Sequence, residues 1–258
     1  MTLRAALSVL PAALAAAGCA SAAPRAVRLQ VPPVVQRAPG CCAPASLSRA
    51  LAVCGVEATQ ADLARRGGCT PDGGADVAAF CRSLRVYLAL RGLSLVPLVE
   101  TDAALALSVA RRHDSEAARL GAAPLARDGA SSGGELALDA LFAGADPEAM
   151  RRATAPRLPR FRRAVSRALS GGRPALWGVV LGIVPESGPA GATARGGHVR
   201  LVTGFDPASG RIFYSDPWGP DCAEKEMAEA DACAVTMSLW ALEDGPGTAV
   251  LAPDRKGK

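Results

Sequence analysis

The sequence predicts an α+β protein in which helices come first and an antiparallel sheet follows. Between residues 42 and 92, apolar residues recur at helical spacing, and glycines and proline bound the helices. After residue 174 the pattern changes to β-rich runs separated by Gly, Pro, Ser and Asp turns. Hydrophobic residues make up 50% of the chain but aromatic ones only 4%, so we expect an aliphatic core and Ala-rich helices.

Three helices are expected in the N-terminal part. Pro44 opens the first, because proline is tolerated in the first helical turn, and Gly55 ends it. Thr59 caps a short second helix that stops at Gly67 and Gly68. The segment 73–92, GGADVAAFCRSLRVYLALRG, predicts a third.

The C-terminal part predicts a meander of three strands. These are ALWGVVLGIV (175–184), HVRLVTGFD (198–206) and RIFYSDP (211–217), and the turn PASG lies between the last two. Residues from about 101 to 157 are rich in Ala and Arg and predict a helical insertion without a catalytic motif. A further helix is expected over 159–170, ending at Gly171 and Gly172.

The first residues indicate export. Residues 1–18 predict a signal peptide, because their apolar run is shorter than the ~20 residues of a membrane-spanning helix. The segment AAGC (16–19) is similar to a bacterial lipobox, which predicts lipidation of Cys19 and a membrane anchor on the bacterial cell envelope. Residues 19–30 are then a tether, and residues 31–258 form the domain. Cleavage near 20–22, leaving a soluble secreted protein, is the alternative.

Charge and motif content argue against several other classes. The net charge of +5 comes from arginines scattered among acidic residues, without the basic block of a nucleic-acid groove. No C-x-x-C pair occurs, and His113 and His198 are isolated in the sequence, which argues against a structural zinc site. Glycine-rich stretches lack the Lys-Ser/Thr of a phosphate cradle. We therefore expect no cofactor, and nothing indicates an oligomeric state.

The cysteine count predicts disulfides in an exported protein. With Cys19 as an anchor, seven cysteines remain, and an odd number leaves one thiol over. The connectivity stays open, with pairs between Cys222 and Cys233, and between Cys54 and either Cys69 or Cys81, as the expected ones.

The leftover thiol suggests a nucleophile. A helix N-terminus and a nearby imidazolium are two common causes of a lowered thiol pKa. Cys42 stands two residues before Pro44, at the start of the first helix, whereas Cys41 is one residue further away. We therefore favour Cys42.

Its partners are expected on the sheet. His198 opens a strand next to this helix and is favoured as the base over His113, which belongs to a charged helix expected to be solvated. Asp216 ends the neighbouring strand and is favoured over Asp206, in the turn at the far end of the hairpin, to orient the base. Gln36, six residues before Cys42, is expected to donate with the Cys42 backbone N–H to an oxyanion.

These residues resemble a known family. VPPVVQRAPGCCAPASLSRALAVCG and GGHVRLVTGFDPASGRIFYSDPWG are similar to the active-site stretches of papain-like cysteine peptidases of the bacteriocin-processing, double-glycine leader type. The resemblance implies a papain-like fold, with Cys on the N-terminal helical part and His and Asp on the sheet. It also implies a peptide or protein substrate and the same roles for Gln36, Cys42, His198 and Asp216.

The sequence departs from that family after the nucleophile. Ala43 stands where glycine is usual, and its methyl group narrows the cleft or shifts the backbone. The expected function is an exported peptidase or amide hydrolase. The alternatives are a peptide-binding or scaffold protein without turnover, and a transpeptidase like phytochelatin synthase, which shares a similar Gln, Cys, His and Asp pattern.

Overall fold

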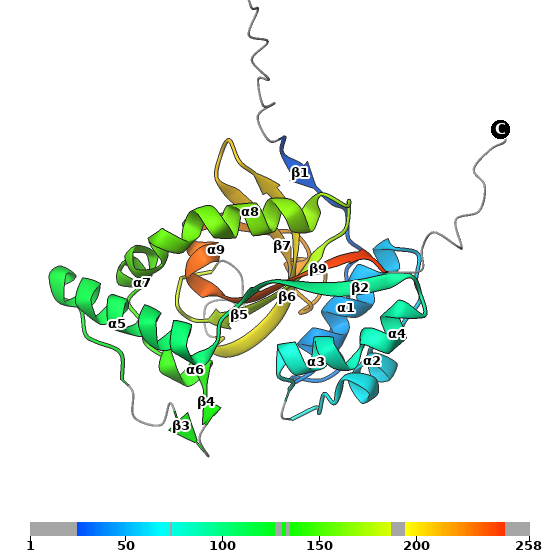
Figure 1. Ribbon diagram of the computed structural model, residues 1–258, viewed down its shortest axis with the longest axis horizontal. Coiled ribbons are helices and arrows are strands. Elements are labelled where there is room, and N and C mark those ends of the chain that lie inside the picture. Colours follow the sequence, from blue (N-terminus) through cyan, green and yellow to red (C-terminus); the bar gives the residue numbers. More distant parts are fainter. Residues whose placement is uncertain (1–24, 73, 127–130, 133–134, 187–193, 246–258) are drawn as a thin grey trace, which may run out of the picture.

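The computed structural model describes residues 25–72, 74–126, 131–132, 135–186 and 194–245 (Figure 1). In these residues the protein has an α+β architecture built around one seven-stranded antiparallel sheet. The strand order is β2-β9-β5-β6-β7-β8, and β1 pairs with β6. The bounds are β1 Val27–Arg28, β2 Leu93–Glu100, β5 Ala175–Leu181, β6 Gly196–Asp206, β7 Arg211–Ser215, β8 Lys225–Ala228 and β9 Thr236–Asp244. A separate hairpin pairs β3 Ser131–Ser132 with β4 Glu135–Leu136.

Two groups of helices pack against the sheet and form separate apolar cores (Figure 1). Successive side chains of a strand point to opposite faces, so Leu176 of β5 joins one core and Trp177 joins the other. The first core contains α1 Cys42–Val53, α2 Gln60–Gly67, α3 Val77–Ser83 and α4 Arg85–Ala89. The second contains α5 Ala103–Leu120, α6 Leu138–Leu141, α7 Pro147–Thr154, α8 Leu158–Leu169 and α9 Glu229–Val235. Two 3₁₀ turns, η1 Ala155–Arg157 and η2 Pro220–Cys222, complete the elements.

The expected meander is confirmed, since β5, β6 and β7 are consecutive antiparallel neighbours. The structure extends this meander by β2 and β9, which the sequence patterns did not indicate. The third expected helix is two helices, because the chain turns at Leu84 (φ −88°, ψ 0°) between α3 and α4. Both helices still bury apolar residues in the same core, among them Phe80 and Leu88.

The end of the expected tether belongs to the sheet. Val27 and Arg28 form β1, opposite Phe205 and Gly204 of β6, and the Leu29 N–H donates to the Thr203 carbonyl at 2.7 Å. Residues 1–24, which include the expected signal peptide and Cys19, lie outside the described residues. Within the described part of the chain, none of the helices is long and apolar enough to cross a membrane.

The segment expected to be a helical insertion contains α5, the β3-β4 hairpin, α6, α7 and η1. His113 of α5 was expected on a solvated helix, but its side chain is fully buried. Its Nε2 accepts a hydrogen bond from the Asp146 N–H at 3.0 Å. Asp146 caps α7, so His113 ties two helices of the second core together and lies outside the cleft described below.

The cysteines of the described segments are all unpaired. The expected disulfides of Cys222 with Cys233, and of Cys54 with Cys69 or Cys81, are therefore not formed in this structure. The Cys233 thiol faces the Thr154 carbonyl at 3.9 Å, whereas the Cys69 thiol donates to the Gly40 carbonyl at 3.0 Å.

Candidate active site

Cys42 is the first residue of α1. The backbone N–H groups of a first helical turn have no acceptor within the helix and carry the positive end of its dipole, which favours a thiolate there. Pro44 fits the first turn because it lacks an N–H, and no acidic residue in this turn opposes the thiolate.

The loop before Cys42 is held by a close backbone approach at Gly40. The Gly40 N–H donates to the Pro71 carbonyl at 2.7 Å. A Cβ at position 40 would lie 2.5 Å from the Thr70 carbonyl oxygen and 2.6 Å from that of Pro71, so no larger residue fits without a backbone shift. The loop after α2 therefore fixes the path on which the chain enters α1.

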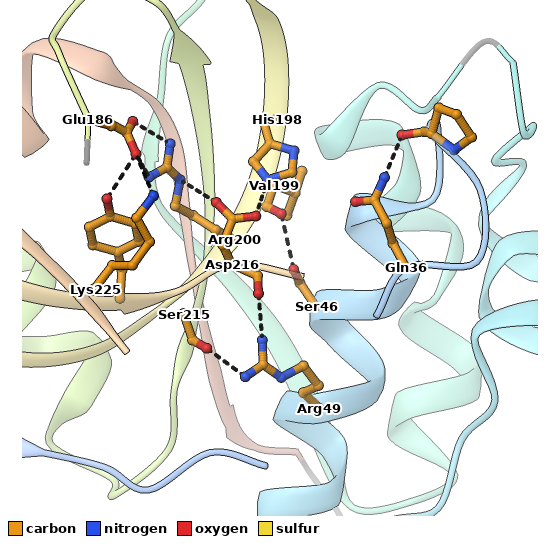
Figure 2. A network of polar contacts seen from close by, with 12 residues as sticks. Gln36, Ser46, Arg49, Glu186, His198, Val199, Arg200, Ser215, Asp216 and Lys225 are labelled. Carbon is orange, nitrogen blue, oxygen red and sulfur yellow. Dashed lines mark hydrogen bonds and ion pairs between the residues drawn. The ribbon is translucent and has the colours of Figure 1, made fainter. Parts of the chain in front are cut away.

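Helix α1 is joined to β6 beside the predicted base. The Ser46 hydroxyl, one turn after Cys42, donates to the Val199 carbonyl at 3.1 Å, and both groups are buried (Figure 2). Val199 follows His198, so this bond sets the position of α1 relative to the imidazole.

His198 and Asp216 form a buried pair between two neighbouring strands. His198 Nε2 lies 2.8 Å from Asp216 Oδ1, with the histidine 7% exposed and the aspartate fully buried. His198 lies in β6, and Asp216 directly follows β7, which pairs with β6. Because Nε2 is bound to Asp216, Nδ1 is the ring nitrogen left for a second partner, and Cys42 lines the same cleft as His198.

The electrostatics of this trio favour an ion pair. Burial opposes ionisation of the Cys42 thiol, but the hydrogen bond and charge of His198, with backbone hydrogen bonds from Val199 and Ala43, hold its pKa below the ordinary value. Burial also disfavours the imidazolium, yet hydrogen bonds to Asp216 and Cys42 raise the pKa of His198. Both shifts favour a thiolate next to an imidazolium.

Trp218 covers the imidazole. The two rings are stacked, with centroids 4.4 Å apart and planes inclined by 23°. Trp218 is itself held by an antiparallel bridge to Val35, and the neighbouring Gln36 N–H donates to the Pro217 carbonyl at 2.7 Å. The segment before α1 and the segment after Asp216 are thereby joined at the site.

The Gln36 side chain does not face the cleft in this structure. Its Nε2 donates to the carbonyls of Ala38 at 3.1 Å and Pro39 at 2.9 Å, which occupies both amide hydrogens. Figure 2 shows one of these two bonds. Gln36 is absent from the residues that line the cleft. In this structure the turn at 38–39 supplies the acceptors of the Gln36 amide, and the role of Gln36 as an oxyanion donor stays a prediction.

Cys42 and His198 open onto a cleft of about 500 Å³. One wall comes from the start of α3, with Val77, and another from Leu138 and Asp139 of α6. The two helix groups thus both border the cleft, and a substrate reaching the thiol would contact each of them.

The structure brings together three of the sequence-predicted residues, namely Cys42, His198 and Asp216. Cys41 is the residue before α1 and lies outside the cleft lining. Asp206 belongs to the β6-β7 turn, where its carboxylate accepts from the Ala208 N–H and the Ser209 hydroxyl.

The sequence reasoning missed the buried cations around Asp216. Arg49 of α1 donates to the Ser215 hydroxyl at 2.5 Å and to the Asp216 carbonyl at 3.4 Å (Figure 2). Arg200 of β6 is fully buried beside the same aspartate. A signal was present, because an arginine inside the apolar run HVRLVTGF needs a buried partner.

No family model matches this chain, and no curated protein sequence shows significant similarity to it. Over the described segments, no group of three or more His, Cys, Asp or Glu side chains could hold a metal ion. The chemistry that the site offers comes from its own residues: a partly buried thiol of lowered pKa and an imidazole held by a carboxylate, both lining a cleft.

Proposed function

We propose that this chain is a thiol-dependent peptidase or amide hydrolase with a papain-like fold, in which Cys42, His198 and Asp216 form the catalytic triad. The observation that carries the proposal is that Cys42, at the start of α1, and His198 line the same cleft, with Asp216 Oδ1 at 2.8 Å from His198 Nε2. This arrangement supplies a nucleophile, a proton carrier and a group that orients the carrier.

In the proposed mechanism, the Cys42 thiolate attacks the carbonyl carbon of a peptide or amide bond and forms a C–S bond. The His198 imidazolium then gives its proton to the leaving amine, the C–N bond breaks, and an acyl-thioester remains on Cys42. A water molecule gives a proton back to His198 and attacks the thioester, which releases the acid and restores the thiol. Throughout, Asp216 holds the ring in one tautomer and orientation.

We propose the backbone N–H of Cys42 as the oxyanion donor. It belongs to the first turn of α1, where N–H groups lack helical acceptors, and it is covalently adjacent to the reacting sulfur. Gln36 would contribute only if its amide released Ala38 or Pro39.

Thiol reactivity tests the nucleophile. Burial raises the pKa of Cys54, Cys81 and Cys222, and raises that of Cys69 and Cys233 to about 11. At about pH 6, where an ordinary thiol of pKa ~8.5 reacts slowly, iodoacetamide should therefore label Cys42 selectively. Peptide mapping by mass spectrometry identifies the site, and a label found elsewhere with Cys42 unmodified would overturn the assignment.

Turnover separates an enzyme from a binding protein. The wild-type protein is incubated with a peptide library and cleavage is followed by mass spectrometry, with Cys42→Ala as the inactive control. Hydrolysed products from the wild type alone support the proposal, and amine-capped products in the presence of an added amine would indicate transpeptidation. Binding of peptides without any product would favour the scaffold alternative.

Export and lipidation are part of the same proposal and rest on the lipobox-like AAGC at 16–19. Expression of the full chain in bacteria with labelled palmitate should yield a labelled, membrane-associated protein. A Cys19→Ser variant should lose the label and appear in the soluble fraction, whereas equal fractionation of both would contradict the anchor.

A further inference from the structure

Arg200 is a fully buried arginine that faces two carboxylates (Figure 2). Its terminal nitrogens form a bidentate pair with Glu186, at 2.9 Å and 2.8 Å. Its Nε points the other way and lies 3.8 Å from Asp216 Oδ2. The guanidinium plane also packs against Trp177 and Tyr214, with its central carbon 5.2 Å and 4.6 Å from the ring centroids. The side chain is therefore held in one orientation between Glu186 and the triad.

Among the described residues, Arg200 Nε is the one arginine or lysine nitrogen within 4.0 Å of the second carboxylate oxygen of Asp216, whereas Arg49 acts on this carboxylate from farther away. Oδ1 is bound to His198, whereas Oδ2 has no hydrogen-bond partner in the described part of the chain, and neither has Arg200 Nε. An ionised carboxylate in a fully buried position needs a nearby cation or hydrogen bonds. Arg200 is placed to meet that need without taking Oδ1 from the imidazole.

Glu186 balances the buried positive charge of Arg200. Burial alone would raise the pKa of Glu186, but the hydrogen bond and charge of Arg200, with the Tyr214 hydroxyl and Lys225, hold it below the ordinary value. The Tyr214 hydroxyl donates to Glu186 at 2.8 Å, and Lys225 Nζ lies 3.5 Å away. The signs then alternate from the sheet edge to the nucleophile, in the order Lys225, Glu186, Arg200, Asp216, His198, Cys42.

We infer that Arg200 is a positioning residue for the triad: its Nε, 3.8 Å from Asp216 Oδ2, keeps the Asp216 carboxylate turned toward His198, and Glu186 anchors Arg200. This inference rests on the proposed function, since it assigns Arg200 a role in activating the Cys42 thiol. It goes beyond the triad because the charged residues from Lys225 to Asp216 then also help to activate the Cys42 thiol.

The charges around Asp216 determine how the loss of Arg200 should shift the pH at which the Cys42 thiolate forms. Groups facing it from the packed elements are Arg49 of α1, Glu186 after β5, His198 and Arg200 of β6, Tyr214 of β7, Cys222 of η2 and Lys225 of β8. Arg49 binds the main-chain carbonyl of Asp216 and not its carboxylate. Without Arg200, the buried carboxylate would lose its nearest arginine and turn away from His198. The imidazolium would lose support, and the thiolate would form only at higher pH.

Two readouts test this without needing a substrate. The first is the pH dependence of Cys42 alkylation by iodoacetamide. The second is the imidazole ¹H–¹⁵N spectrum, which is simple because the chain has only two histidines, and His113 can be assigned with a His113→Asn variant. In Arg200→Met, we expect the alkylation midpoint to rise by about one pH unit, an about tenfold loss of rate on the acidic side, and loss of the imidazolium signal of His198.

A double variant separates positioning from simple damage to the core. Arg200→Met alone leaves Glu186 without its bidentate partner, so Arg200→Met with Glu186→Gln removes both charges and protects folding. We expect the double variant to keep the raised midpoint, because Asp216 still lacks its cation. Arg200→Lys, which retains a cation without the fork, should lie between the wild type and Arg200→Met. The matched control is Arg151→Met, which breaks a 2.5 Å ion pair to Asp231 between α7 and α9 and should leave the midpoint unchanged.

The outcomes distinguish this inference from the proposed function. If wild-type Cys42 shows no enhanced reactivity toward iodoacetamide, the proposed function is overturned, and the positioning role of Arg200 is overturned with it. If the wild type reacts as expected but the double variant shows the wild-type midpoint and the wild-type His198 signal, the role of Arg200 is overturned while the triad stands. Circular dichroism melts of each variant show that the compared proteins are folded.

Discussion

The His198 imidazole lies stacked on the Trp218 indole, with ring centroids 4.4 Å apart. Asp216 binds the edge of the same ring at Nε2. One face of the base is thereby shielded, while its orientation is set from the side. The aspartate and the tryptophan come from a single stretch, DPW at 216–218, so one turn of chain after β7 supplies both supports.

Trp218→Ala should reduce kcat/KM by about 10²-fold, since a small displacement of a catalytic group has an effect of that order. Trp218→Phe retains a stacking ring and should stay within about tenfold of the wild type, because aromatic pairs contribute only about 0.5–1.5 kcal/mol beyond burial. Steady-state kinetics on a peptide found in the library test measure both. Equal activity of the alanine variant and the wild type would remove Trp218 from the site.

The pH profile should be bell-shaped. The thiolate is present above the lowered pKa of Cys42, and the imidazolium below the raised pKa of His198. Activity should therefore persist below the ordinary thiol pKa of ~8.5 and above the ordinary imidazole pKa of ~6.5. It should fall on the alkaline side as His198 loses its proton. Measured kcat/KM against pH tests this, and a single rise near the ordinary thiol value would contradict the ion pair.

His198 also links stability to pH. Its folded-state pKa is raised above that of the unfolded chain, so the imidazolium stabilises the fold fully below the unfolded value. This contribution is lost as the pH rises through the folded pKa. Urea unfolding of the wild type and His198→Asn across this window should show a pH-dependent difference that is larger at the acidic end, and a constant difference would argue against the shift.

Gln36→Ala should lower kcat by less than about tenfold, because both amide hydrogens are bound to Ala38 and Pro39. The loss of these bonds should instead loosen the turn before Cys42 and lower the melting temperature. A kcat loss of about 10²–10³ would show that the amide leaves a carbonyl and donates to the oxyanion during turnover. Gln36→Glu, which lacks the amide hydrogens but keeps the length, is the matched comparison.

Arg49→Met should destabilise the protein by about 2–4 kcal/mol, since it breaks a buried hydrogen-bond network. Arg49 is 2% exposed and donates to the Pro32 carbonyl at 2.6 Å as well as to Ser215 and Asp216. Urea unfolding measures the change. Arg173→Met, which breaks a partly exposed ion pair to Asp244, serves as the control and should cost less than about 1 kcal/mol.

Local pattern was sufficient for the α+β class and for three strands of the sheet. Alternating apolar residues and turn residues mark β5, β6 and β7, because a strand's period and its bounding turns are properties of a few neighbouring residues. The same locality explains why Cys42 could be placed at the start of α1 and Asp216 at the end of β7. The sequence patterns did not indicate strands β2 and β9, because these strands lie far apart in the chain and meet only through pairing.

The sequence alone determined which residues stand at helix starts and strand ends, and thus the candidates Cys42, His198 and Asp216. Only the tertiary structure decided what surrounds them. It placed Trp218 on the imidazole, Arg200 beside Asp216 and His113 in the core, and it bound Gln36 Nε2 to nearby carbonyls. The physical reason is that a buried charge or amide is satisfied by whatever groups packing brings within about 3–4 Å, and spacing along the chain does not specify those groups.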